Sequence, residues 1–123
     1  MRRQPSRAHL LVLAMALGAA GCGSTATMLP GGGDADRGAS LMEAYGCGAC
    51  HTIPGLRGAD AHVGPDLGDF AERRSIAGSL PNTPGNLVRW LENPQRVEPG
   101  TLMPDLDVPE AAARDIAAYL YAH

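Results

Sequence analysis

The sequence predicts an all-α domain in which three main helices are joined by short turns. Apolar residues recur at helical spacing in three separate segments, and no segment shows the alternation that is typical of strands. The 123-residue chain also contains only one Phe, one Trp and three Tyr. A domain this small buries little surface, so its core needs additional support. We therefore expect a large apolar group that is not part of the polypeptide to complete the core.

The first 21 residues have the features of a signal peptide. Residues 1–7 are basic, with three Arg, and residues 10–20 form an apolar run. A bilayer core needs about 20 apolar residues to be spanned, so this run is too short to be a transmembrane helix. We expect residues 1–21 to be removed and the mature protein to be exported to the periplasm or another extracytoplasmic space.

Residues 19–22 read Ala-Ala-Gly-Cys and resemble the lipobox of bacterial lipoproteins, although this motif more often has Leu where Ala19 stands. The resemblance implies a lipid on Cys22. The alternative is an ordinary cleavage site that leaves Cys22 as a free thiol, which is an oxidation hazard in an exported protein. Residues 22–35 are rich in Gly, Ser and Thr, and we expect them to form a flexible tether between a membrane anchor and the folded domain.

The first helix is predicted over residues 36–45. Leu41, Met42 and Tyr45 share one face, and Gly46 follows as the residue that ends the helix. A shorter helical turn is expected over residues 69–76.

The second helix is predicted to begin at Thr83, which caps it, with Pro84 in the first turn. It ends at Asn93 because Pro94 disfavours helical backbone in the residue before it. Its apolar face comprises Leu87, Trp90 and Leu91.

The third helix is predicted from a capping-box pattern formed by Asp107 and Glu110. The residues at core-facing helical positions are Ala112, Ile116, Tyr119 and Leu120. The folded domain is therefore expected to span residues 36–123.

Residues 47–51 read Cys-Gly-Ala-Cys-His, the haem-attachment motif C-x-x-C-H. The thiols of Cys47 and Cys50 are spaced to reach two vinyl groups of one haem, and His51 follows as an iron ligand. A redox C-x-x-C motif is usually found in a βαβ setting, and no strand is predicted here. A zinc site would need a second pair of ligands, and His62 and His123 do not have that spacing. The motif therefore predicts one covalent haem c.

Taken together, residues 36–121 resemble the class I c-type cytochromes. Residues 64–67 are similar to the Gly-Pro-x-Leu segment of that family. The resemblance implies that the carbonyl of Pro65 accepts a hydrogen bond from His51 and so orients the ring; the alternative is an ordinary turn. It also implies that Gly38 and Tyr119 lie where the first and last helices cross.

Residues 91–104 resemble the Leu-Glu-Asn-Pro and Pro-Gly-Thr-x-Met stretch of mitochondrial-type cytochromes c. The resemblance implies that Met103 is the second axial iron ligand and that Thr101 bonds a haem propionate or braces the loop. Trp90 stands where the mitochondrial forms have Tyr, and its indole N–H is expected to reach a propionate or a water molecule. Met42 is interpreted as a core residue.

The chain also resembles the cytochrome domain of subunit II of caa-type oxidases, at Gly46 and residues 82–84. All ten basic residues are Arg, and loss of the three in the leader leaves a formal charge of −6, with no basic patch for nucleic acid. The expected function is that of a monomeric, membrane-tethered electron carrier without enzymatic activity. Its expected partners are a terminal oxidase or a quinol-oxidising complex.

The sequence is compatible with two other functions. One is a haem relay within a larger redox complex. The other is a haem peroxidase or gas sensor with an open iron position, in which His62 would be the polar group beside the iron.

Overall fold

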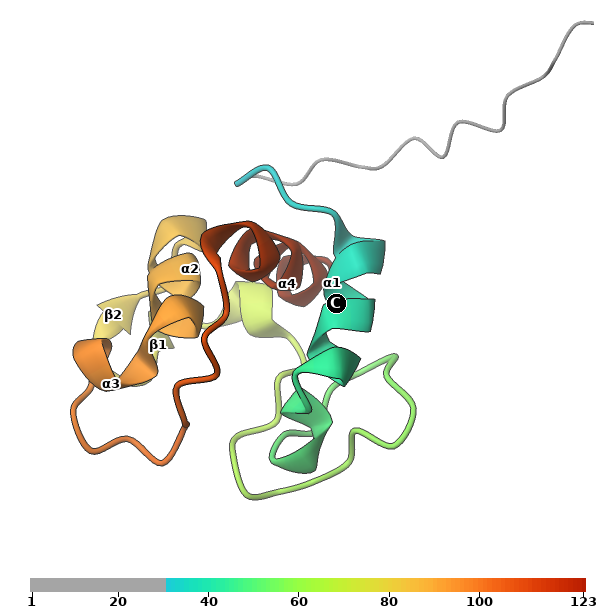
Figure 1. The fold of residues 1–123 in the computed structure, drawn as a ribbon, viewed down its shortest axis with the longest axis horizontal. Coiled ribbons are helices and arrows are strands. Elements are labelled where there is room, and N and C mark those ends of the chain that lie inside the picture. Colours follow the sequence, from blue (N-terminus) through green and yellow to red (C-terminus); the bar gives the residue numbers. More distant parts are fainter. Residues whose placement is uncertain (1–30) are drawn as a thin grey trace, which may run out of the picture.

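The computed structural model describes residues 31–123, so the predicted signal peptide, Cys22 and the first part of the tether lie outside the described residues. The predicted all-α class is confirmed. Residues 31–123 form four helices, α1 (Ala35–Ala44), α2 (Pro84–Glu92), α3 (Pro94–Val97) and α4 (Glu110–Ala122) (Figure 1). They also form 3₁₀ turns over Cys47–Ala49 and Phe70–Glu72 and the short strands β1 (Ser75–Ile76) and β2 (Leu80–Pro81).

Helices α1 and α4 cross at close range (Figure 1). Gly38 of α1 is buried at the crossing, where an added Cβ atom would overlap the backbone of Asp115 and lie 3.1 Å from Cβ of Tyr119. Only glycine fits between the two backbones. The crossing residues implied by the resemblance are therefore the ones found there.

Asp115 of α4 is a buried carboxylate with partners on the N-terminal side of the domain. It accepts hydrogen bonds from Nε (2.5 Å) and Nη2 (3.1 Å) of Arg37 and from the backbone N–H of Asp34 (2.8 Å). The hydrogen bond from Arg37 lowers the pKa of Asp115 below its ordinary value. Residues 31–34, which the sequence analysis assigns to the tether, are thus attached to α4.

Helix α2 begins as predicted. The hydroxyl of Thr83 accepts from the N–H of Asn86 (3.3 Å), and Pro84 is the first helical residue. The chain then starts α3, which the sequence analysis did not predict. Asn93 ends α2 and also caps α3 by accepting from the N–H of Arg96 (2.8 Å).

The predicted capping box at the start of the last helix is wrong. Helix α4 begins at Glu110 with Pro109 as its N-terminal flanking residue, and Asp107 has a φ of +53° and caps nothing there. The reason is Pro109, which disfavours helical backbone in the residue before it and so delays the helix.

The segment over residues 69–76 is also only partly helical. It forms the 3₁₀ turn Phe70–Glu72 and then β1, which pairs antiparallel with β2 through Ser75 with Pro81 and Ile76 with Leu80. The expectation of no strands is therefore corrected here. Strands of two residues are too short for an alternating pattern to be visible in the sequence.

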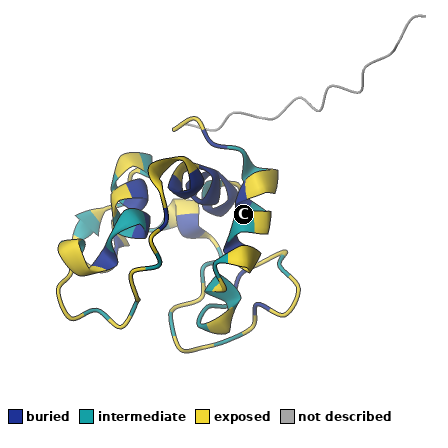
Figure 2. Ribbon diagram, viewed as in Figure 1, coloured by how far each residue is buried: buried dark blue, intermediate teal, exposed yellow. Residues whose placement is uncertain are grey.

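Buried residues gather where α1, α2 and α4 face one another, and the loops at the other end of the domain are mostly half-buried or exposed (Figure 2). The large side chains with less than 2% of their surface exposed are Met42, Ile53, Leu87, Pro94 and Ile116. Met42 is thus a core residue, as expected.

Candidate functional site

A cavity of about 720 Å³ lies beneath the helices, between the loop after α1 and the loop after α3. The range typical of cofactor sites is about 300–1,000 Å³. Apolar side chains of α1, α2 and α4 line its inner part, including Met42, Leu87 and Ile116. All seven residues predicted to bind the cofactor or its metal line this one cavity: Cys47, Cys50, His51, Pro65, Trp90, Thr101 and Met103.

The attachment motif lies on one wall of the cavity, directly after α1. Gly46 adopts a left-handed conformation (φ +72°) that ends the helix and turns the chain into the 3₁₀ turn Cys47–Ala49. The N–H of His51 donates to the carbonyl of Cys47 (3.1 Å), which keeps the motif compact. Both thiols are free and half-buried, and burial raises the pKa of Cys47.

The imidazole of His51 is held by residues 64 and 65. Its Nδ1 atom lies 2.7 Å from the carbonyl oxygen of Pro65, the contact that the resemblance implies. A carbonyl oxygen only accepts, so Nδ1 carries the proton and Nε2 keeps a free lone pair for a metal ion. An added Cβ atom on Gly64 would overlap the ring, so a side chain at this position would displace the imidazole.

Met103 lies in the loop that follows α3. Its side chain is half-buried and lines the cavity, whereas its neighbour Leu102 is 91% exposed. The hydroxyl of Thr101 accepts from the N–H of Met103 (3.4 Å), a long contact that is consistent with the bracing role expected for Thr101. Trp90 enters the cavity wall from α2.

Arg73 is a cavity residue that the sequence analysis missed. Its Nη2 donates to the carbonyls of Asp66 and Gly68, and its guanidinium carbon lies 5.4 Å from the centre of the Phe70 ring. It gives the apolar cavity one fixed positive charge near the His51 side. The adjacent Arg74 is exposed and does not line the cavity, and nothing in the sequence distinguishes these two arginines.

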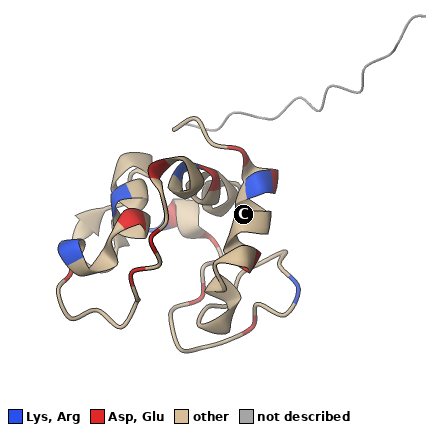
Figure 3. Ribbon diagram, in the orientation of Figure 1, with Lys and Arg blue, Asp and Glu red and all other residues tan. Residues whose placement is uncertain are grey.

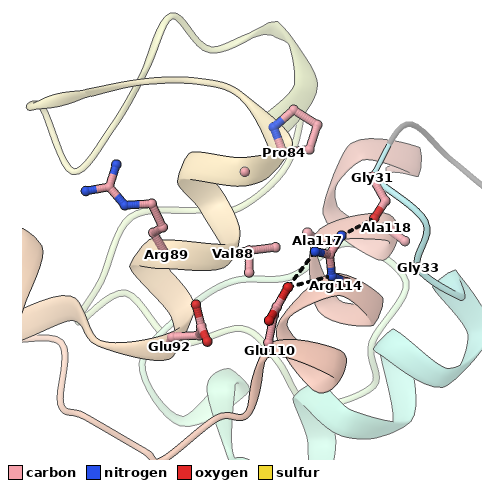
Figure 4. Close-up of a pocket in the computed structure, with 11 residues that line it drawn as sticks. Gly31, Gly33, Pro84, Val88, Arg89, Glu92, Glu110, Arg114, Ala117 and Ala118 are labelled. Carbon is pink, nitrogen blue, oxygen red and sulfur yellow. Dashed lines mark hydrogen bonds and ion pairs between the residues drawn. The ribbon is translucent and has the colours of Figure 1, made fainter.

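A second, smaller cavity of about 190 Å³ lies between the start of the described chain, α2 and α4 (Figure 4). Arg114 crosses it, donating to Glu110 (2.5 Å) and to the carbonyl of Gly31 (2.9 Å). None of the seven residues predicted to bind the cofactor lines it. It marks where the N-terminal segment joins the domain.

Within residues 31–123, no group of three or more His, Cys, Asp or Glu side chains could hold a metal ion. The large cavity instead offers the imidazole of His51 and the thioethers of Met42 and Met103. No helix in this part of the chain is long and apolar enough to cross a membrane.

An all-α domain with a C-x-x-C-H motif on the wall of one apolar cavity defines the class of c-type haem proteins. The comparison with known families agrees: the Cytochrome c family model matches residues 35–122, and the chain belongs to this family. Its cofactor is covalently bound haem c.

Curated relatives of the chain are oxidase subunits. It is 36% identical over 87 residues to cytochrome c oxidase subunit 2 of Alkalihalophilus pseudofirmus, a match that covers 70% of this chain and 25% of the relative. It is 41% identical over 59 residues to the subunit 2 of Bacillus sp. strain PS3, covering 46% of this chain and 17% of the relative. The third, from Bacillus subtilis, is 32% identical over 71 residues, covering 56% of this chain and 20% of the relative. The predicted similarity to a subunit II cytochrome domain is confirmed, and the chain spans a quarter or less of the length of these relatives.

The cavity fits the cofactor. Its volume and apolar inner walls suit a flat macrocycle, and both thiols stand at its edge. The donor set also fits iron, because imidazole and thioether are the ligands found in electron-transfer cytochromes of type c.

Proposed function

We propose that Cys47 and Cys50 bind the haem covalently, that His51 and Met103 are its axial ligands, and that the domain carries single electrons. The observation that supports this most strongly is that all four residues line one cavity although Met103 lies 52 residues after His51 in the chain. When bound, haem c supplies one-electron redox chemistry at its iron.

The surrounding residues would tune this chemistry. The carbonyl of Pro65 would accept a hydrogen bond from the Nδ1–H of His51, which fixes the ring and strengthens Nε2 as a metal ligand. The apolar inner wall keeps water out and favours the less charged, reduced form. Trp90, Thr101 and Arg73 bring hydrogen-bond donors to the cavity, and these are the groups that would bind the haem propionates.

Two axial protein ligands leave no iron position for a substrate, which favours an electron carrier over a peroxidase or gas sensor. His62 gives that alternative no support. It is exposed, its Nδ1 lies 3.3 Å from the hydroxyl of Thr52, and it is not among the residues that line the cavity.

The proposed partner is a terminal oxidase, because the curated relatives are oxidase subunits. Figure 3 shows Arg residues dispersed over several helices and loops, and the net charge of the whole chain is −3. Long-range attraction to an acidic partner surface is therefore weak. Val63 and Leu102 are the exposed large apolar residues of residues 31–123, and both lie at the cavity wall. We propose that the partner docks there, beside the haem edge.

Lipidation of Cys22 would confine the domain near such a partner at an extracytoplasmic membrane surface and raise its effective concentration. The relay alternative also has support, since the matched relatives contain the similar region as part of a longer subunit. A quinol-oxidising complex is the alternative proposed redox partner.

The ligation is tested with Met103→Ala, and Leu102→Ala is its matched control on the adjacent residue. We expect Met103→Ala to abolish the weak charge-transfer band of thioether-bound ferric haem, to lower the potential and to let the reduced protein bind carbon monoxide. Leu102→Ala should keep the band and slow oxidation by oxidase-containing membranes. Rapid carbon monoxide binding by the unmutated protein would favour the sensor or peroxidase.

A further inference from the structure

The loop that carries Met103 has little regular structure of its own. The loop between α3 and α4 spans residues 98–109, and the one backbone hydrogen bond that joins two of these residues runs from the Thr101 N–H to the Glu98 carbonyl (3.1 Å). Backbone groups that lack a helix or sheet partner need other partners. This loop therefore depends on side chains for its conformation.

One side chain supplies most of these partners. The Nε2 atom of Gln95 donates to the carbonyl of Thr101 (2.7 Å) and to the carbonyl of Met103 (3.0 Å). Its Oε1 atom accepts from the N–H of Gly100 (3.3 Å). A primary amide has two N–H donors and one carbonyl acceptor, and here each is used. The amide orientation is fixed, because rotation by 180° would break all three bonds.

Gln95 is itself held on a short, well-defined support. It lies in α3, where Pro94 is the first residue and the side chain of Asn93 accepts from the Arg96 N–H (2.8 Å). Pro94 is fully buried. The amide of Gln95 thus projects from a fixed point onto the loop that follows.

The two carbonyls bound by Gln95 flank Leu102. Fixing Thr101 and Met103 on one side of the loop turns Leu102 outwards, where it is 91% exposed. Leu102 and Met103 both line the cavity, but the side chain of Met103 is half-buried there. The geometry points to Gln95 as a positioning residue that holds the thioether of Met103 in place, an inference that rests on the proposed ligation by Met103.

If Gln95 holds this loop in place, a ligand that displaces Met103 from ferric iron must also break the hydrogen bonds of the Gln95 amide. Imidazole is such a probe, and its binding is followed by loss of the charge-transfer band. Two variants separate the contributions. Gln95→Met keeps the chain length and removes all three bonds, whereas Gln95→Glu keeps the acceptor for Gly100 and removes both donors.

Arg96→Gln is the matched control. Arg96 lies on the same helix, and its side chain makes no hydrogen bond to any other of residues 31–123. The substitution changes the net charge by the same amount as Gln95→Glu. Because each neutral hydrogen bond makes a modest net contribution, we expect both Gln95 variants of the haem-loaded protein to bind imidazole about tenfold more tightly. Arg96→Gln should bind it like the parent.

The inference is overturned if the Gln95 variants bind imidazole with the affinity of the parent, even when their melting temperatures are lower. A reduced melting temperature alone would indicate a merely structural role. Met103→Ala provides the second arm. If it leaves the band and the imidazole affinity unchanged, the proposed ligation is wrong; if only the Gln95 variants are without effect, the ligation stands and the role of Gln95 is wrong.

Discussion

The crossing of α1 and α4 differs from the cavity-side loops in what its residues pack against. At the crossing, protein atoms meet protein atoms: Gly38 leaves no space for a side chain, and Asp115 is bonded to Arg37 and Asp34. On the cavity side, the loops after α1 and α3 surround a space of about 720 Å³. The first region is complete without a cofactor, whereas the second is built to enclose one.

The hydrogen bonds of the two regions differ in the same way. Those of Asp115 reach across 78 and 81 residues of sequence and tie the two ends of the domain together. Those of Gln95 reach six and eight residues and shape one loop. The hydrogen bonds at the crossing therefore fix how distant parts of the chain are arranged, and those of Gln95 fix the conformation of a single loop.

The largest effect is expected from Cys47→Ser combined with Cys50→Ser, which removes the covalent haem. Without it, the apolar cavity walls would face water, and a domain with so few large side chains cannot compensate. We expect the haem-free chain to be largely unfolded by circular dichroism, with the haem-loaded parent as control. Native-like helix content in the haem-free protein would show that the crossing folds on its own.

A smaller effect is expected from Gly38→Ala at the crossing. The added methyl group would overlap the backbone of Asp115, and overpacking of this kind costs about 1–3 kcal/mol in the free energy of unfolding. Gly85→Ala in α2 is the matched control, because an added Cβ atom there meets nothing within 4 Å. It should be neutral or stabilise by up to about 1 kcal/mol. Equal denaturation midpoints for the two variants would contradict the close approach of α1 and α4.

The smallest effect is expected from Arg37→Met, and it should depend on pH. Arg37 lowers the pKa of Asp115 in the folded protein, so the carboxylate contributes stability that is fully present above its unfolded pKa of about 3.9. That contribution is lost as the pH falls through the lower folded pKa. The melting temperatures of parent and variant should therefore differ most near neutral pH and converge in acid.

Arg89→Met is the charge-matched control for this pH series. Arg89 is exposed, and within residues 31–123 its side chain bonds only to that of Asn86 on the same helix. The melting temperature of Arg89→Met should change with pH in the same way as that of the parent. If the difference in melting temperature between the parent and Arg37→Met stays constant into strong acid, ionisation of Asp115 is not the cause of that difference.

Much of the helical frame follows from local sequence. Thr83 and Pro84 start α2 where their residue types predict, and Gly46 ends α1 as expected, because caps depend on a few consecutive residues. The local prediction failed at Asp107, because Pro109 disfavours helical backbone before it and the helix begins only at Glu110.

The sequence by itself determined the attachment motif, the three main helices and the family resemblance. Only the tertiary structure placed Arg73 at the cavity, made Asp115 a buried partner of Arg37 and directed the amide of Gln95 at the Met103 loop. Motifs and caps are recognisable because their chemistry is contained in adjacent residues. Arg, Asp and Gln occur throughout any soluble chain, and their roles depend on which carbonyl, carboxylate or cavity the folded backbone brings within about 3 Å.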